Sequence, residues 1–394
     1  MSARALVIVA SVLSLGSASA QTPAVTGVFV STLGKDTIQI ERYTRSGDKL
    51  EGDIVRRAPR VQVIHYVADL ASGKVKGMSV STRRYGADAT TAPIFSMVTL
   101  LADSTASVEV QRSGRPDTVN TGTRSFKGRV IPLVPGIPPS LAMYEQALIN
   151  NPPAARDTIL FNVITAGFGP NPNMRLYRRA RDTVVFVSSF SPGWTEVVTV
   201  DQSGRIQSLD GTLTTVKAIT RRAPNLDFDA VTRGWGAFEA ARGPVGAMSP
   251  ADTVRATVGA ANLEVVYSRP SKRGRTIFGN VVPLDSVWRT GANAATMLTT
   301  SSDLIIGNTP VPAGKYTLWT IPSRTGAKLI INSQTGQWGT EYDASKDFAR
   351  IDIAQNVLTK PVEEFTFAIV PQGAGGILKY SWDDREFSVP IRVK

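Results

Sequence analysis

The 394-residue chain contains no cysteine and one histidine, and both shortages restrict its chemistry. Without thiols it forms no disulfide, no zinc–thiolate site and no iron–sulfur cluster, and it has no cysteine nucleophile. The single imidazole, His65, excludes a multi-histidine metal site within one chain. We therefore expect no metal site and no cofactor, and we expect stability to rest on packing.

Sequence motifs for several common activities are also missing. The chain has no Gly-x-Ser-x-Gly elbow, no P-loop and no dinucleotide-binding glycine pattern. His65 lies in a β-branched run with the parity of Val61, Val63 and Val67, which favours a strand histidine satisfied by a neighbour over a catalytic base. No catalytic residue is predicted, and the sequence favours a non-enzyme without deciding the matter.

One apolar run stands out, close to the N-terminus. Residues 5–16 follow Arg4 and precede the small-x-small pattern of residues 18–20, which is the layout of a secretory signal peptide. We expect residues 1–20 to be a signal peptide cleaved between Ala20 and Gln21, giving a periplasmic or secreted, soluble protein. The alternative is a retained membrane anchor. No later run is long enough for a transmembrane segment.

Basic residues outnumber acidic ones, with 44 Lys+Arg against 32 Asp+Glu and a formal net charge of +12. The arginines are scattered and form no stripe with aromatic residues, so we expect no nucleic-acid partner. In an exported protein, such a charge favours an anionic or glycan small ligand, or an envelope lipid.

Short β-branched runs separated by turn residues dominate the chain and predict an all-β fold. The Gly- and Pro-rich segment 243–250 is the best candidate for a linker. We predict two antiparallel β domains on either side of it. The N-terminal domain, residues 21–242, is expected to be a curved sheet or half-barrel with one helix. The C-terminal domain, residues 251–394, is expected to be a β-sandwich or jelly roll.

The one helix is predicted over residues 139–149. Ser140 is a suitable N-cap, and Leu141, Tyr144 and Leu148 share one face at a spacing of 3.6 residues. This amphipathic pattern indicates a helix that plugs or flanks a sheet. Residues 228–238 are compatible with either a loop or a short helix.

Three ordered blocks of the C-terminal domain carry a family resemblance. They are residues 267–279, which begin Tyr-Ser-Arg-Pro-Ser, residues 287–296, which begin Val-Trp-Arg-Thr-Gly-Ala-Asn, and residues 312–322, which begin Pro-Ala-Gly-Lys-Tyr. Over about residues 248–394 the chain resembles domain-of-unknown-function family 2911, found in exported bacterial proteins. The resemblance implies a compact β domain of unestablished activity. The family commonly has an acidic residue where this chain has Ala294, which argues against a catalytic carboxylate there.

The N-terminal domain is similar in its expected fold to curved-sheet envelope proteins of the lipoprotein-carrier type. The similarity lies in the strand meander with a single amphipathic helix, and no motif carries it. It therefore implies a fold and no function.

The second block of the C-terminal domain is the densest group of candidate binding residues. Its tryptophan offers a flat apolar face, and its arginine offers a planar fork suited to carboxylate, phosphate or sulfate. We expect an aromatic-walled polar pocket for a sugar or small anion, built from Tyr267, Arg269, Trp288, Arg289, Thr290, Asn293 and Trp338. The alternative is a structural corner in which Arg289 pairs with a buried carboxylate such as Asp343 or Asp384.

The carboxylates of the C-terminal domain offer a second functional hypothesis, a hydrolase. Their spacing selects no pair. Asp343 precedes a short helical pattern that it could cap, and Asp383-Asp384 indicates a hairpin tip. A third hypothesis is a structural or assembly factor that presents sheet edges to partners. The leading hypothesis remains an exported protein that binds a glycan, lipid or small anion without transforming it.

Overall fold

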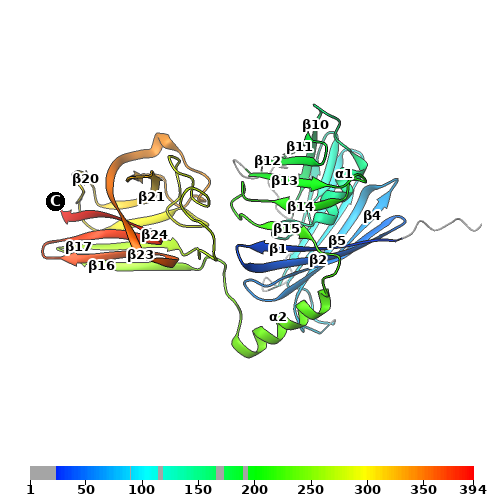
Figure 1. Cartoon of the computed structure of the whole chain (residues 1–394), viewed down its shortest axis with the longest axis horizontal. Coiled ribbons are helices and arrows are strands. Elements are labelled where there is room, and N and C mark those ends of the chain that lie inside the picture. Colours follow the sequence, from blue (N-terminus) through cyan, green and yellow to red (C-terminus); the bar gives the residue numbers. More distant parts are fainter. Residues whose placement is uncertain (1–23, 89, 114–118, 166–172, 190–193) are drawn as a thin grey trace, which may run out of the picture.

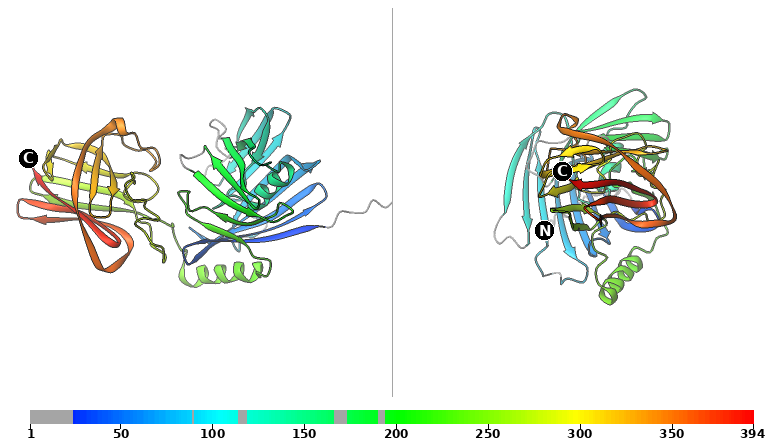
Figure 2. Two further views of the ribbon diagram at one scale, coloured as in Figure 1. Left: turned by 45° about the horizontal axis from the view of Figure 1, so that its top comes forward. Right: turned by 90° about the vertical axis from the view of Figure 1, so that its left-hand side faces the viewer.

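A computed structural model describes residues 24–394 apart from residues 89, 114–118, 166–172 and 190–193. The predicted signal peptide lies outside the described residues. Two large sheets and two helices account for the regular structure, which confirms the predicted all-β class. The sheets lie at opposite ends of the long axis and are joined by a coil (Figures 1 and 2). Neither described helix has the length and apolar character needed to cross a membrane.

The N-terminal sheet has fifteen strands in the order β8-β7-β6-β5-β4-β3-β2-β1-β15-β14-β13-β12-β11-β10-β9. All described neighbours are antiparallel except β9 and β10. The strands are β1 (Val25–Leu33), β2 (Asp36–Ser46), β3 (Lys49–Arg56), β4 (Gln62–Ala71), β5 (Lys74–Arg84), β6 (Phe95–Leu101), β7 (Thr105–Arg112), β8 (Asn120–Ser125), β9 (Arg129–Pro132), β10 (Thr158–Ile164), β11 (Asn173–Ala180), β12 (Thr183–Ser188), β13 (Trp194–Val200), β14 (Ile206–Asp210) and β15 (Ile219–Arg222).

This sheet is strongly curved, as its connectivity requires. Strands β8 and β9 form opposite ends of the hydrogen-bonded order, yet only residues 126–128 separate them in sequence. A connection that short spans roughly 14 Å when fully extended, so the two edges of the sheet must lie near each other. The half-barrel shape is visible in Figure 2.

Helix α1 (Leu141–Asn150) lies inside this curve, and it confirms the predicted helix within two residues at its start and one at its end. The Ser140 hydroxyl caps it by accepting a hydrogen bond from the Met143 backbone amide. Its N-terminus also faces the buried carboxylate of Glu41, which accepts from the Leu141 amide at 2.8 Å and from the Tyr66 hydroxyl at 2.8 Å. The helix and both halves of the sheet share one hydrophobic core.

A second helix, α2 (Phe228–Arg242), resolves the ambiguity of residues 228–238. Asp227 caps it, and Phe228 packs on the outer face of the sheet against Ile40 and Val55. The N-terminal domain thus has this second helix in addition to α1. Gly234, Gly236 and neighbouring β-branched residues give this segment low intrinsic helix propensity, and tertiary packing compensates for it.

The C-terminal sheet has nine strands in the order β16-β17-β18-β21-β22-β23-β24-β19-β20. It follows the coil of residues 243–250. The strands are β16 (Ala251–Val258), β17 (Ala261–Ser268), β18 (Thr296–Thr300), β19 (Leu304–Ile306), β20 (Thr309–Val311), β21 (Gly314–Pro322), β22 (Ala327–Asn332), β23 (Asp347–Gln372) and β24 (Gly375–Val393), with a 3₁₀ turn, η1 (Ala344–Lys346), before β23.

Two layers of this sheet enclose one aromatic-rich core, and β23 belongs to both. Its first part, to Ile353, pairs with β22, and its later part pairs with β24. The pairing with β24 is irregular around Pro361, which lacks the amide that a regular ladder needs. The predicted hairpin tip at Asp383-Asp384 was wrong, because both residues lie within β24 and the β23–β24 turn is ten residues earlier.

The two sheets touch where the β1–β2 turn meets the loop after β17. Asp36 forms an ion pair with Arg273, and the Lys35 amide donates to the Arg273 carbonyl at 3.1 Å. Gly34 makes this approach feasible, because its φ is +61° and a Cβ there would collide with that same carbonyl oxygen. Met248 of the connecting coil packs beside Leu33. The interface thus depends on one close backbone approach.

Candidate functional site

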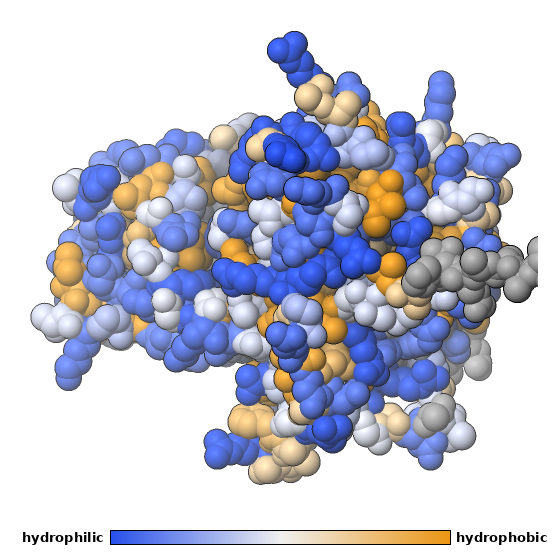
Figure 3. Space-filling model, turned by 45° about the vertical axis from the view of Figure 1, so that its right-hand side comes forward, coloured by the Kyte–Doolittle hydropathy of each residue, from blue (hydrophilic) through white to orange (hydrophobic). Residues whose placement is uncertain are grey.

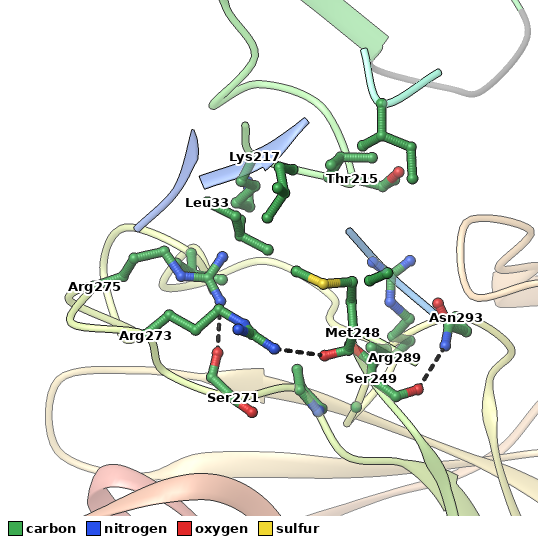
Figure 4. Close-up of a pocket in the computed structure, with 18 of the residues that line it drawn as sticks. Leu33, Thr215, Lys217, Met248, Ser249, Ser271, Arg273, Arg275, Arg289 and Asn293 are labelled. Carbon is green, nitrogen blue, oxygen red and sulfur yellow. Dashed lines mark hydrogen bonds between the residues drawn. The ribbon is translucent and has the colours of Figure 1, made fainter. Parts of the chain in front are cut away.

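A cavity of about 280 Å³ lies between the two sheets, at the coil that connects them. Figure 4 shows Leu33, Thr215 and Lys217 of the N-terminal sheet opposite Arg273, Arg275 and Arg289 of the C-terminal one. Five cationic side chains line the cavity, and no described carboxylate does. The cations are Arg56, Lys217, Arg273, Arg275 and Arg289.

Arg289 extends from a loop that the aromatic core holds in place. The preceding Trp288 exchanges two backbone hydrogen bonds of 2.8 Å with Thr320 and stacks on Trp382 at a centroid distance of 6.1 Å. The aliphatic part of Arg289 lies against Gly339, where a Cβ would collide with Cδ of the arginine. The contacts of Trp288 fix the loop, and Gly339 leaves room for the aliphatic part of Arg289. Together they direct the guanidinium toward the cavity.

The loop backbone adopts unusual conformations next to this arginine. Thr290, Gly291 and Asn293 have φ angles of +50°, +153° and +58°. Thr290 is fully buried and is held by a 2.8 Å hydrogen bond to the Thr320 hydroxyl, while its carbonyl accepts from Thr296 at 2.7 Å. Glycine tolerates such a conformation, but the two non-glycine residues, Thr290 and Asn293, cost conformational energy that the surrounding contacts must offset.

The guanidinium of Arg289 has no partner among the described residues. Its Nε is buried and makes no hydrogen bond, and neither terminal nitrogen forms a hydrogen bond or ion pair. Burial lowers the pKa of Arg289 from its usual value, although an arginine remains charged at physiological pH. An uncompensated buried donor is unfavourable by about 1–3 kcal/mol, so the arrangement calls for an acceptor.

The other cations have partners that leave most of their charge uncompensated. Arg275 donates to the Ser271 carbonyl at 2.7 Å, Lys217 to the Thr212 carbonyl at 2.8 Å, and Arg56 to the Gln62 side chain at 2.8 Å. Arg273 alone among the five is paired with a carboxylate, that of Asp36. The remaining four place net positive charge around the cavity.

The charges oppose one another across the gap between the sheets. Burial lowers the pKa of Lys217 first, and the positive charges of Arg289 and Arg275 lower it further. Lys217 lies in the loop between β14 and β15, and the two arginines lie in the segment between β17 and β18, so the repulsion acts across the interface between the domains. A bound anion would attract the cations of both domains and so replace this repulsion with attraction.

The structure places four of the seven predicted site residues on this cavity: Trp288, Arg289, Asn293 and Trp338. Asn293 also donates to the Ser249 carbonyl at 3.1 Å, which ties the loop to the connecting coil. The indole of Trp338 is half exposed. Trp288 is almost fully buried, so its rings belong mainly to the core and it shows the cavity only an edge.

Three predicted residues do not line the cavity. Tyr267 is buried in the core and donates to Asp252 at 3.1 Å. Arg269 pairs with Asp252 at 3.4 Å and with Glu364 at 3.1 Å. Thr290 is enclosed by the Thr320 contact described above. These residues support the loop and do not face the open space.

The expected alternative, in which Arg289 pairs with a carboxylate, is not what the structure shows. Asp343 caps η1 by accepting from the Ser345 amide at 2.9 Å, as its position in the sequence predicted. Asp384 approaches Arg385 at 3.8 Å. Within the described ranges no three metal-ligating side chains gather into a cluster. His65, as expected of a strand histidine, contacts a neighbour, Asp53, at 2.9 Å.

Sequence reasoning missed four of the five cations. Lys217 and Arg56 come from the other domain, and no local pattern connects them with residue 289. Arg273 and Arg275 left a signal in the basic segment Lys272-Arg273-Gly274-Arg275, which lies within the first of the blocks already singled out, residues 267–279. A concentration of charge within that block was the available clue.

Comparison with known proteins extends the description only for the C-terminal domain. Residues 249–391 match the family described as "Protein of unknown function (DUF2911)", which confirms the resemblance drawn from the sequence. No curated protein matches the chain. A solved structure of a DUF1089 family protein from Pseudomonas aeruginosa is similar over 44% of this chain and 90% of its own, at 11% identity and a TM-score of 0.31. Likeness at that level supports no inference about fold or function.

Proposed function

We propose that this protein binds a small anion in the cavity between its two sheets, without transforming it. The observation that carries the proposal is the guanidinium of Arg289, which is unpartnered in a cavity lined by further cations and by no described carboxylate. Arginine recognises carboxylate, phosphate and sulfate oxygens through paired, charge-assisted hydrogen bonds. A predicted export signal would place such a site outside the cytoplasm, where it would meet envelope or environmental anions.

The test is calorimetric titration of the full chain with inorganic phosphate, sulfate and citrate. Arg289→Ala removes the unpartnered guanidinium. Arg324→Ala is the matched control, because Arg324 is exposed on the same domain and does not line the cavity. A charge-assisted hydrogen bond contributes about 1.5–3 kcal/mol, so Arg289→Ala should weaken binding by roughly tenfold to a hundredfold. The control should bind as the wild type does.

Binding should also weaken as sodium chloride is added, because chloride competes for the site and salt screens its charge. Equal affinity in the wild type and Arg289→Ala would overturn the proposal. Failure of the wild type to bind any of the three anions at millimolar concentration would overturn it as well.

A further inference from the structure

A second cavity, of about 450 Å³, lies within the N-terminal domain and differs in character from the first. Its lining comes from Tyr144 of α1, the segment 133–139 and residues of β11, β13 and β14. Most of its lining is apolar. Examples are Leu133, Val134, Met174, Leu209 and Ala218.

The polar groups in this wall are occupied by other protein groups. The Tyr144 hydroxyl donates to Glu196 at 3.2 Å, and the Thr214 hydroxyl donates to the Gly211 carbonyl at 2.7 Å. Burial raises the pKa of Glu196 to about 7, so that carboxyl is largely neutral in mildly acidic solution. The cavity therefore offers a guest an apolar surface with few free polar groups.

The two cavities are adjacent. Arg56, Ile137 and Val216 line both of them, so the cationic and the apolar space meet at these three side chains. Ile137 is also partly exposed. Figure 3 shows a mostly hydrophilic surface with small hydrophobic groups on one outer face of the molecule. The large apolar surfaces named here are internal.

We infer that the ligand is a single-chain anionic amphiphile, with its charged head beside Arg289 and its hydrocarbon chain in the apolar cavity. The inference rests on the proposed function and specifies the ligand class for the same site. Its basis is that a cationic and an apolar cavity share three wall residues. A phosphate or carboxylate head suits the cations, and a flexible alkyl chain suits an irregular apolar space behind them.

The test is a chain-length series of alkyl phosphates, from methyl to dodecyl, titrated below their micelle concentrations with inorganic phosphate as the reference. Each methylene that enters the apolar cavity should raise affinity about fourfold, until the cavity is filled and the gain stops. Leu133→Trp should abolish this gain by filling the apolar cavity while leaving inorganic phosphate binding unchanged, because Leu133 lines the apolar cavity and not the cationic one. Leu213→Trp is the control, because Leu213 is exposed on a nearby loop and lines neither cavity.

The outcomes separate this inference from the proposed function. If inorganic phosphate binds through Arg289 but chain length adds nothing, the amphiphile inference fails and the anion site stands. If Arg289→Ala binds every alkyl phosphate of the series as tightly as the wild type does, the alkyl chain binds elsewhere and the inference fails. If Leu133→Trp does not fold, Met174→Trp, at another residue that lines only the apolar cavity, makes the same test. No binding by any compound overturns both proposals.

Discussion

Replacing Arg289 with methionine should stabilise the ligand-free protein, which is the reverse of what a structural arginine would do. Methionine keeps an unbranched stem for the slot beside Gly339 and removes the guanidinium. The buried Nε has no acceptor, so its loss recovers about 1–3 kcal/mol. It also removes a positive charge that acts on Lys217. At about 2–4 °C per kcal/mol, the melting temperature of this domain should rise by several degrees.

The same variant should fail to respond to ligand. At a phosphate concentration one hundred times its dissociation constant, the wild type should gain about 2.7 kcal/mol of stability, and Arg289→Met should gain far less. Urea unfolding with and without phosphate measures both effects. Arg269→Met is the matched control, because Arg269 is paired with Asp252 and Glu364 and its loss should destabilise the protein under both conditions.

The reasoning would be refuted if Arg289→Met, without phosphate, lost stability as Arg269→Met is expected to. That result would mean that the chain itself stabilises the Arg289 guanidinium. Arg289→Met could instead gain stability without phosphate and still respond to phosphate as the wild type does. That result would support the claim that the buried guanidinium is unfavourable, and it would refute the claim that the guanidinium binds phosphate.

Two further predictions concern the domain contact and a buried acid. Gly34→Ala should weaken phosphate binding and increase the radius of gyration in X-ray scattering, because a Cβ at residue 34 collides with Arg273. Gly47→Ala is the control, because Gly47 has a similar φ of +55° and no nearby atoms, and it should change neither quantity. Glu196 has a pKa of about 7 when folded and near 4.5 when unfolded, so the folded state holds its proton more tightly and loses roughly 3 kcal/mol as pH rises from 4.5 to 8. Glu196→Gln can still form a hydrogen bond with Tyr144 but has no carboxyl to titrate, so urea unfolding across that pH range should show no such loss of stability in this variant. Identical pH profiles for the variant and the wild type would contradict the prediction.

The fold was largely predictable because period-two patterns record which face of a strand is buried. Leu263, Val265 and Tyr267 share one parity in β17, and all three are buried. The same pattern, applied consistently, would have assigned Tyr267 to the core instead of to the candidate site. The aromatic side chain of Tyr267 suggested a binding residue, but its position in the strand places it on the buried face.

The cavity itself was not predictable from one local segment. Arg289 was identified because an arginine directly after a tryptophan and two residues before a glycine is chemically conspicuous. Its lack of a partner could not be inferred, since that depends on where every carboxylate of the chain lies in space. Nor does any local pattern bring Lys217 to face it, because the approach depends on the β1–β2 turn docking on the Arg273 loop.

Domain docking and anion binding should therefore be coupled. The contact between the sheets is held by a few groups, including the Asp36–Arg273 ion pair and the Lys35 amide. Lys217 and Arg289 repel each other across the same interface. The proposed anion would lie between like charges from both domains and replace repulsion with two attractions. By thermodynamic linkage, docking then strengthens anion binding by the same factor by which a bound anion strengthens docking, so a site formed only when the domains meet would also hold them together.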